Sequence, residues 1–179
     1  MIKLEFVKLN EDAKIPQNAH SLDAGIDFST IEEGEVYPGS THVFSTGLAL
    51  KMDWDFKNTL DSFYLPSFMK ENYNEEVMTE FVSCINSWYL DNQVPYLELK
   101  SRSGLSLKGI HVGAGVIDCE YRGEIKIVLH NISKKAVMIN KGDKIAQGII
   151  RFRPNVNIDL VKSLDDTQRG TNGFGSTGV

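Results

Sequence analysis

The feature that most limits the fold of this 179-residue chain is a series of short apolar stretches, each followed by residues that favour a turn. The stretches have the length of strands, several are rich in valine and isoleucine, and they span 42–52, 96–101, 123–131, 135–140 and 144–152. Between them lie YPGS, SLKG and NKGD, whose glycine, proline and asparagine supply tight reversals. Because no helices alternate with these stretches, the pattern predicts an all-β fold: an antiparallel sandwich, jelly roll or barrel.

One segment, residues 52–95, breaks this pattern. From Glu75 to Tyr89 apolar residues recur at helical spacing, and Asn74 stands where an N-cap belongs, ahead of two glutamates. The spacing predicts an amphipathic helix there. Residues 54–65, ahead of Pro66, allow a shorter helix, although their periodicity is poor. The segment therefore reads as a helical insertion in a single all-β domain.

This insertion has two readings. A long surface excursion that packs on its own apolar stripe is thermodynamically tolerable, and that is the simpler interpretation. The alternative is a docking surface for a regulatory protein partner, or an addition near the mouth of the site, and in either case Trp54, Trp88 and Tyr89 would be candidate contacts.

Charge and composition narrow the ligand. The formal net charge of −5 is not the footprint of a protein that binds DNA or RNA. The charge of an anionic ligand must therefore be balanced locally, by a few arginines, by backbone amides or by a metal ion, which favours a small phosphorylated molecule.

The sequence has no apolar run of membrane-spanning length, its start lacks the order of a signal peptide, and Cys84 and Cys119 are too few for a disulfide framework. We expect a reduced, cytoplasmic setting.

Two stretches carry candidate chemistry in the middle of the chain. In LKSRSGLSLKG (99–109) a strand runs into Arg102, Ser103 and Gly104, a turn that can cradle phosphate, although RSG also occurs by chance in many loops. In 113–131 Asp118 precedes Tyr121 and a turn at Arg122 and Gly123, and the two flanks read as the arms of a hairpin. The aspartate is either a general base or one of the many that satisfy turn amides.

Three further stretches are ordinary loops when taken alone. DAGIDFS (23–29) puts Asp27 just before a strand, and KGDKIAQGII (141–150) puts Gln147 after a glycine-aspartate turn. The glycine-rich tail RGTNGFGSTGV (169–179) cannot hold a conformation by itself. It is either a frayed terminus or a lid that orders on a ligand with both phosphate and an aromatic ring, since it carries hydrogen-bond donors and one phenylalanine.

Together and in this order, DAGIDFS, RSGLSLKG, GAGVIDCEYRGEI, KGDKIAQ and RGTNGFGSTG resemble the five motifs of the trimeric dUTPase family, which hydrolyses dUTP to dUMP and pyrophosphate. The resemblance covers the chain except for the insertion. It implies a distorted jelly roll (β-clip) over 1–167, interrupted at 52–95, and a flexible arm over 168–179 that closes an active site. It also implies a homotrimer with shared sites that keeps dUTP low and supplies dUMP for thymidylate synthesis.

The resemblance assigns the roles residue by residue. Asp118 would deprotonate the water that attacks the α-phosphorus, and Tyr121 would pack against the sugar and reject a ribonucleotide. Asp27 would act through water on a Mg²⁺ held by the phosphates. The backbone around Gly115, Ile117 and Lys126 would read uracil. The remaining contacts to dUTP would come from Arg102, Ser103, Gly104, Gln147, Arg169, Phe174, Gly175, Ser176 and Thr177, with the ring of Phe174 stacked over uracil.

Some features depart from the family pattern. Ser101 stands where proline is common and Lys144 where arginine is common, and compact members lack the insertion. Some virus-encoded members carry extra segments, which leaves a phage or viral origin, and then the host cytoplasm, open.

Two competing functions remain. A dCTP deaminase shares the jelly-roll trimer but needs a glutamate base and a different arginine-serine motif. A nucleotide-sensing protein could bind dUTP while its insertion docks a regulator. The four histidines form no paired zinc motif, and Cys119 is expected to be a spectator.

Overall fold

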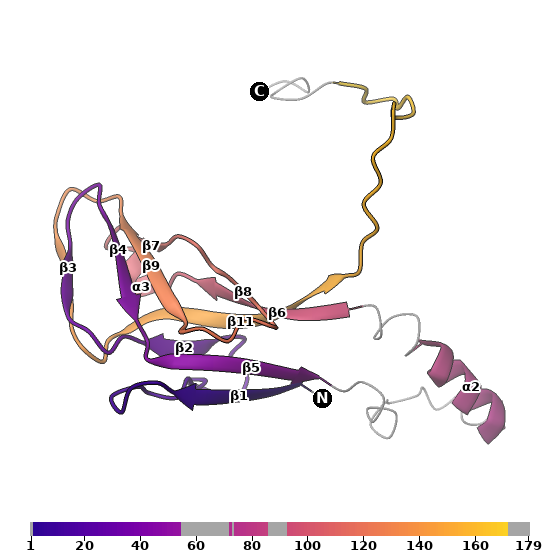
Figure 1. The fold of residues 1–179 in the computed structure, drawn as a ribbon, viewed down its shortest axis with the longest axis horizontal. Coiled ribbons are helices and arrows are strands. Elements are labelled where there is room, and N and C mark those ends of the chain that lie inside the picture. The colour runs from indigo at the N-terminus through magenta and orange to yellow at the C-terminus, as the bar shows by residue number, and fades with distance from the viewer. Residues whose placement is uncertain (1, 55–71, 73, 86–92, 172–179) are drawn as a thin grey trace.

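The structure is a computed structural model, and it describes residues 2–54, 72, 74–85 and 93–171. Its strands pair antiparallel in four sheets, in the orders β2-β11-β6-β8, β4-β9-β7, β1-β5 and β10-β3 (Figure 1). The strands are β1 Ile2–Lys8, β2 Ile26–Ser29, β3 Gly34–Val36, β4 Thr41–Ser45, β5 Leu48–Trp54, β6 Gln93–Lys100, β7 Ile110–Val112, β8 Val116–Asp118, β9 Lys126–Asn131, β10 Val137–Ile139 and β11 Lys144–Pro154. The predicted all-β architecture is confirmed.

The core is built by alternation along these strands. In β9, Ile127 and Leu129 are buried, whereas Val128 between them is only partly buried. The same alternation in β6 buries Leu97 and Leu99. Other fully buried side chains come from several sheets and pack in the same cluster: Phe28, Val36, Phe44, Leu48, Ile110, Ile125, Ile139 and Ile145. This core fixes the positions of the strand ends that carry the motif residues.

The stretch 42–52 is two strands, not the single strand predicted. Gly47 has φ of +67°, a conformation that favours glycine, and an added Cβ would approach Asn10 and Ala13 within 3.1 Å. The Thr46 hydroxyl donates to the Ile125 carbonyl over 2.6 Å. The chain therefore changes sheet at this point, since β4 pairs with β9 and β5 pairs with β1.

The predicted hairpin around Arg122 and Gly123 is also wrong in part. β9 does pair with the earlier β7, and the Gly113 amide donates to the Val128 carbonyl. The residues between leave that sheet, because β8 pairs with β6 instead. Asp118, at the end of β8, therefore belongs to the β6 sheet.

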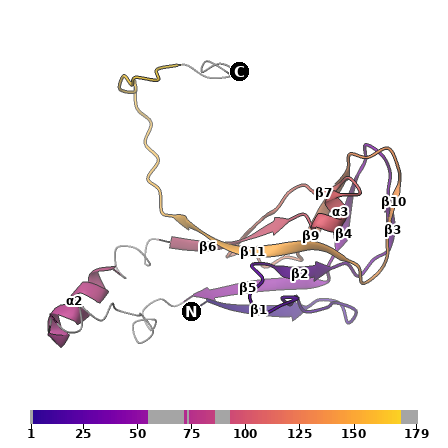
Figure 2. The same cartoon turned by 180° about the vertical axis from the view of Figure 1, so that it is seen from behind.

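The helix predicted from Glu75 begins where expected. Helix α2 spans Glu75–Ile85, and the Asn74 side chain accepts a hydrogen bond from the Val77 amide over 2.9 Å. Figures 1 and 2 show α2 beyond the ends of β5 and β6, apart from the sheets. Residues 86–92, with Trp88 and Tyr89, and the shorter helix predicted over 54–65 lie outside the described residues, except that Trp54 ends β5.

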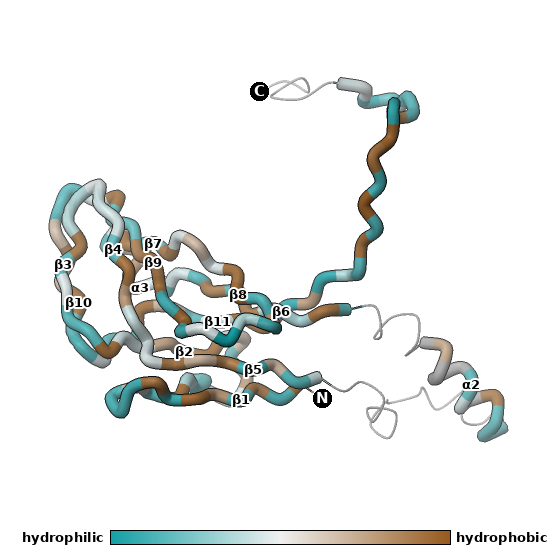
Figure 3. The backbone as a smooth tube through the Cα atoms, viewed as in Figure 1, coloured by the Kyte–Doolittle hydropathy of each residue, from teal (hydrophilic) through white to brown (hydrophobic). Residues whose placement is uncertain are grey.

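The segment that follows β11 runs away from the sheets (Figures 1 and 2). Residues 155–171 are all exposed, and hydrophobic positions alternate with polar ones along the first part of the segment (Figure 3). Ile158 is 89% exposed and Leu164 is 85% exposed. Among the helices that the structure describes, none has the length and apolar character to cross a membrane.

Candidate functional site

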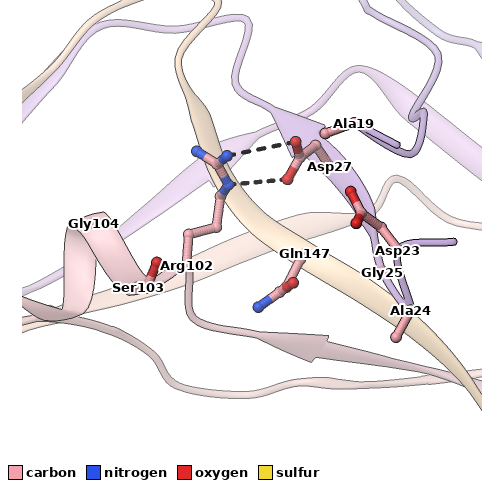
Figure 4. Close-up of a pocket in the computed structure, with 9 residues that line it drawn as sticks. All are labelled: Ala19, Asp23, Ala24, Gly25, Asp27, Arg102, Ser103, Gly104 and Gln147. Atoms are coloured by element: carbon pink, nitrogen blue, oxygen red, sulfur yellow. Dashed lines mark hydrogen bonds and ion pairs between the residues drawn. The ribbon is translucent and has the colours of Figure 1, made fainter. Parts of the chain in front are cut away.

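Three of the five motifs meet at one pocket of about 570 Å³ (Figure 4). Asp27 comes from β2 and Gln147 from β11, and Arg102 immediately precedes the short helix α3 (Ser103–Ser106). The lining is completed by Ala19, Asp23, Ala24, Gly25, Ser103 and Gly104. The predicted residues Asp27, Arg102, Ser103, Gly104 and Gln147 are thus brought together by one chain. We call this hollow the Arg102 pocket.

Strand pairing places Asp27 and Gln147 side by side. They are register partners on β2 and β11, and Asp27 lies within β2, not just before it as predicted. The Gln147 side-chain amide donates to the Ser101 carbonyl over 3.1 Å. Gly25 is small because Gln147 is near, since a Cβ at Gly25 would come within 3.0 Å of the Gln147 Oε1. Gly25 of the DAGIDFS motif therefore packs closely against Gln147 of the fourth motif.

Asp27, Arg102 and Lys144 form a closed set of contacts that we call the Asp27 cluster. Arg102 Nε donates to Asp27 Oδ1 over 2.9 Å, and Arg102 Nη2 lies 3.5 Å from Asp27 Oδ2. Lys144 Nζ contacts the same Oδ2 over 2.9 Å, while Arg102 Nη1 donates to the Lys144 carbonyl over 3.2 Å. The Asp27 side chain is only 13% exposed, so its charge is balanced locally by two cations.

Gly104 has a different reason to be glycine from Gly25. Apart from its chain neighbours and the backbone of its own helix, no atom of the described residues lies within 4 Å of a Cβ built at this position. The fold of one chain therefore leaves room for a side chain at Gly104. Gly104 also lines the Arg102 pocket.

Asp118 and Tyr121 line a second hollow, of about 530 Å³, with Trp54, Val94, Pro95, Cys119, Glu120 and Arg153. The Tyr121 amide donates to the Asp118 carbonyl over 3.0 Å and the Tyr121 hydroxyl to the Glu124 carbonyl over 3.0 Å. The Tyr121 ring lies so close to Gly123 that a Cβ there would approach its hydroxyl to 2.4 Å. The turn thus presents the Tyr121 ring at the surface, 45% exposed.

Three further predicted site residues are Gly115 and Ile117, which lie beside β6, and Lys126, which begins β9. The Gly115 carbonyl accepts a 2.6 Å hydrogen bond from the Leu99 amide, and a Cβ on Gly115 would come within 2.7 Å of the Leu99 carbonyl. Ile117 faces Leu97 across the β6–β8 ladder. Lys126 opens β9 with an exposed side chain whose ammonium lies 3.8 Å from a Glu124 carboxylate oxygen.

One chain does not bring Asp118 to the Arg102 pocket. The two hollows share no lining residue. Asp118 pairs with Tyr96 on β6, six residues before Arg102, and an extended strand rises by about 3.3 Å per residue, so the two positions lie at most about 20 Å apart along the chain. Asp118 and Arg102 therefore lie in two separate hollows of one chain.

The tail residues are only partly described. Arg169 is exposed at the end of the extended segment, whereas Phe174, Gly175, Ser176 and Thr177 lie outside the described residues. The structure also adds pocket residues that the sequence reasoning missed. Asp23 and Gly25 lie in the DAGIDFS motif itself, which was the available signal, whereas Arg153 near Asp118 had none.

Comparisons with known proteins agree on one family. A dUTPase family profile matches residues 76–178. A deoxyuridine 5′-triphosphate nucleotidohydrolase of Clostridioides difficile is 36% identical over 181 residues, covering 99% of this chain and 99% of that protein. The enzyme of the same name from Rabbitpox virus is 32% identical, covering 98% and 93%.

Solved structures have the same architecture. A point mutant of the dUTPase of Staphylococcus bacteriophage 80alpha, solved with dUpNHpp, gives a TM-score of 0.67 at 22% identity, covering 99% of both chains. A mutant dUTPase from phage phi11 of S. aureus, described with a structural Mg(II) ion, gives 0.61 at 21% identity, covering 92% of this chain and 99% of that one. These likenesses confirm the predicted all-β fold.

Proposed function

The chain belongs to the dUTPase family and is an enzyme that hydrolyses dUTP, and we propose that Asp118 is the general base for the attack of water on the α-phosphorus. The products are dUMP and pyrophosphate. The observation that best supports dUTP hydrolysis is the convergence of three ordered motifs on the Arg102 pocket. The chain's relatives over nearly its whole length are dUTP nucleotidohydrolases.

The phosphates would bind in the Arg102 pocket. Arg102 offers charged donors there, the Ser103 hydroxyl and the backbone at Gly104 border the same space, and Gln147 supplies an amide. Displacement at phosphorus requires positioning and charge neutralisation more than covalent help from the protein. A pocket whose arginine is already held by Asp27 suits that task.

Uracil and the sugar would bind along the stretch from Gly115 to Lys126, which includes Asp118. Backbone groups around Gly115, Ile117 and Lys126 are proposed to pair with the uracil edge, so that cytosine leaves buried polar groups unpaired. The Tyr121 ring, exposed over Gly123, would pack on the deoxyribose and clash with a 2′-hydroxyl. Asp118 lies three residues away at the end of β8, next to the proposed position of the sugar and α-phosphate.

We propose a homotrimer with shared active sites. The placement of Asp118 and Arg102 in separate hollows, up to about 20 Å apart along the chain, supports this, because in a shared site one chain could supply the Asp118 hollow and another the Arg102 pocket to the same nucleotide. The exposed apolar residues of 155–164 also support it, since hydrophobic side chains in an extended segment gain most by packing on another copy. The arm beyond them, with Arg169, Phe174, Gly175, Ser176 and Thr177, would then close over a site formed by other chains.

Mg²⁺ is proposed as the cofactor, carried by the substrate. Among the described residues no group of three or more His, Cys, Asp or Glu could hold a metal ion, so this part of the chain offers no closed cage. The Arg102 pocket does present carboxylates from Asp23 and Asp27, and these oxygens fit an ion that keeps much of its water. The ion would neutralise charge on the phosphates, and Asp27 would act on it through water.

A second role concerns the insertion. Helix α2 stands apart from the sheets, and Val77 on it is 45% exposed (Figure 1). Phage 80alpha dUTPases with the same fold are described as controlling transfer of virulence genes, and the phage phi11 enzyme as having a species-specific insert. We propose that the insertion at 52–95 docks a regulatory protein, in a cytoplasmic setting, which is the host cytoplasm if the source is viral. Deleting 55–92 should keep dUTP turnover and abolish capture of that partner, whereas the absence of any partner of the intact protein would refute this role.

The test of the main proposal is pyrophosphate release from dUTP, dCTP, dTTP and UTP, with Mg²⁺ and with excess chelator. We expect turnover of dUTP alone, and a large loss without the ion. Equal turnover of all four nucleotides would refute the proposed recognition of uracil and deoxyribose. Ammonia release from dCTP would favour the deaminase alternative.

A further inference from the structure

The Asp27 cluster includes one cation, Lys144, for which the family resemblance gives no role. We infer that Lys144 is a positioning residue for the phosphates of dUTP, and that it acts through Asp27 on Arg102. The inference rests on the proposed contact between Arg102 and the phosphates. It deepens that proposal by naming what sets the orientation of the arginine.

An irregularity in β11 brings Lys144 to Asp27. Gln147 pairs with Asp27 and Ala146 with Phe28, but Lys144 pairs with Ser29, so Ile145 is an extra residue in the ladder. In a regular ladder Lys144 would point to the face of Ala146, which is buried. The extra residue turns Lys144 to the face of Asp27 and Gln147, as β-bulges near functional sites commonly do.

Lys144 then holds the cluster at two points. Its carbonyl accepts a hydrogen bond from Arg102 Nη1, and its ammonium contacts Asp27 Oδ2. Asp27 in turn takes Arg102 Nε on its other oxygen. The guanidinium is therefore held along its Nε edge and at Nη1, which leaves further N–H groups on its two terminal nitrogens for an anion. Loss of the Lys144 charge would free one Asp27 oxygen to pull the guanidinium out of this pose.

A direct contact between Lys144 and the phosphates fits the structure less well. Lys144 does not line the Arg102 pocket. It lines a neighbouring hollow of about 650 Å³ with Lys8 and Lys14, and that hollow shares only Ala19 and Asp27 with the Arg102 pocket. Asp27 therefore lies between Lys144 and the proposed phosphates. This position favours an indirect effect of Lys144, through Asp27, over a direct contact with the phosphates.

The experiment compares Lys144→Met with Lys14→Met, which removes the same charge from the same neighbouring hollow. Affinity for a nonhydrolysable imido analogue of dUTP is measured by calorimetry, and KM and kcat are measured with dUTP. We expect Lys144→Met to weaken binding and raise KM by about three- to tenfold with little change in kcat, because a positioning group shifts ground-state and transition-state binding together. Lys14→Met should stay within about twofold, and Lys144→Arg should restore most of the affinity. Equal effects of Lys144→Met and Lys14→Met would mean general electrostatics and overturn the inference.

A double-mutant cycle separates the link from a direct contact. In an Asp27→Asn background, Lys144→Met should add little, because the carboxylate through which it acts is gone. Additive effects on affinity would overturn the inference. Arg102→Lys tests the proposed phosphate contact separately. If this variant keeps the affinity of the parent, the phosphate contact of Arg102 is wrong. If Arg102→Lys loses affinity and Lys144→Met does not, only the role of Lys144 is refuted. Lys144→Gln repeats the test if the methionine variant does not fold, and thermal melts confirm the fold of every variant.

Discussion

The two ends of β6 carry the two halves of the proposed site, and they are built differently. At the Lys100 end, side chains from three parts of the chain hold one another, and the carboxylate of Asp27 is nearly buried between two cations. At the Tyr96 end, Asp118 and Tyr121 sit in a surface turn that is held mainly by hydrogen bonds to backbone carbonyls. The Arg102 end is thus organised within one chain, whereas the Asp118 end is open.

This difference shows how the enzyme can divide its work. Charged donors for a triphosphate must be fixed before binding, because their reorientation would reduce affinity. The proposed base, Asp118, and the ring proposed to contact the sugar, Tyr121, would need a second surface to exclude water, and the described residues of one chain leave both exposed. The comparison therefore predicts that changes at the Asp118 end alter catalysis, and that the Asp118 end works with the Arg102 end of another copy.

The largest effect should come from Asp118→Asn. Loss of a general base lowers kcat by about 10²–10⁴-fold, and we expect about 10³-fold here with KM for dUTP little changed. Steady-state pyrophosphate release measures both quantities. Glu120→Gln, in the same hollow, is the matched control and should keep most of the activity. Undiminished turnover in Asp118→Asn would exclude it as the base.

Mixing two inactive variants tests whether the two ends meet across chains. If each site takes Asp118 from one chain and Arg102 from another, random co-assembly of Asp118→Asn with Arg102→Ala restores about a quarter of the sites, since each half is intact with a probability of about one half. Activity of the mixture should thus rise far above that of either variant. Asp118→Asn mixed with a differently tagged copy of itself is the control. A mixture that stays inactive while co-assembly is verified would contradict the shared site.

Truncation after Thr167 should separate catalysis from stability. The exposed segment leaves the sheets after β11, so we expect the thermal melting temperature to stay nearly unchanged. Without the arm to close the site, kcat/KM should fall by about 10²-fold. Removing only Gly178 and Val179 is the control, and it should leave kcat/KM and the melting temperature almost unchanged. A fully active Thr167 truncate would show that the arm is not a lid.

The sequence predicted those parts of the fold whose signals are local. Asn74 marked the start of α2 because a cap acts within one turn. The three-residue β8 was missed because its pairing with β6 is set by distant residues, and the extra residue at Ile145 that turns Lys144 toward Asp27 has no signature of its own. The motifs named Asp27, Arg102 and Gln147, but only the strand register places them around one pocket.

The smallest effect concerns Glu98, midway between the two ends of β6. The hydrogen bond from Lys100 lowers the pKa of the Glu98 carboxyl, partial burial opposes this, and Arg151 on β11 lowers it further. A carboxyl whose pKa is lower in the folded state stabilises the fold above its unfolded pKa, about 4.3, and loses that contribution as the pH falls through the folded value. Glu98→Gln should therefore be slightly less stable than the parent at pH 7, and the two melting curves should converge below about pH 4. Exposed Glu33→Gln is the control for loss of charge. A difference in melting temperature that stays constant from pH 7 to pH 3 would mean that Glu98 stabilises the fold by packing. The ion pairs of Glu98 would then contribute nothing to the stability of β6.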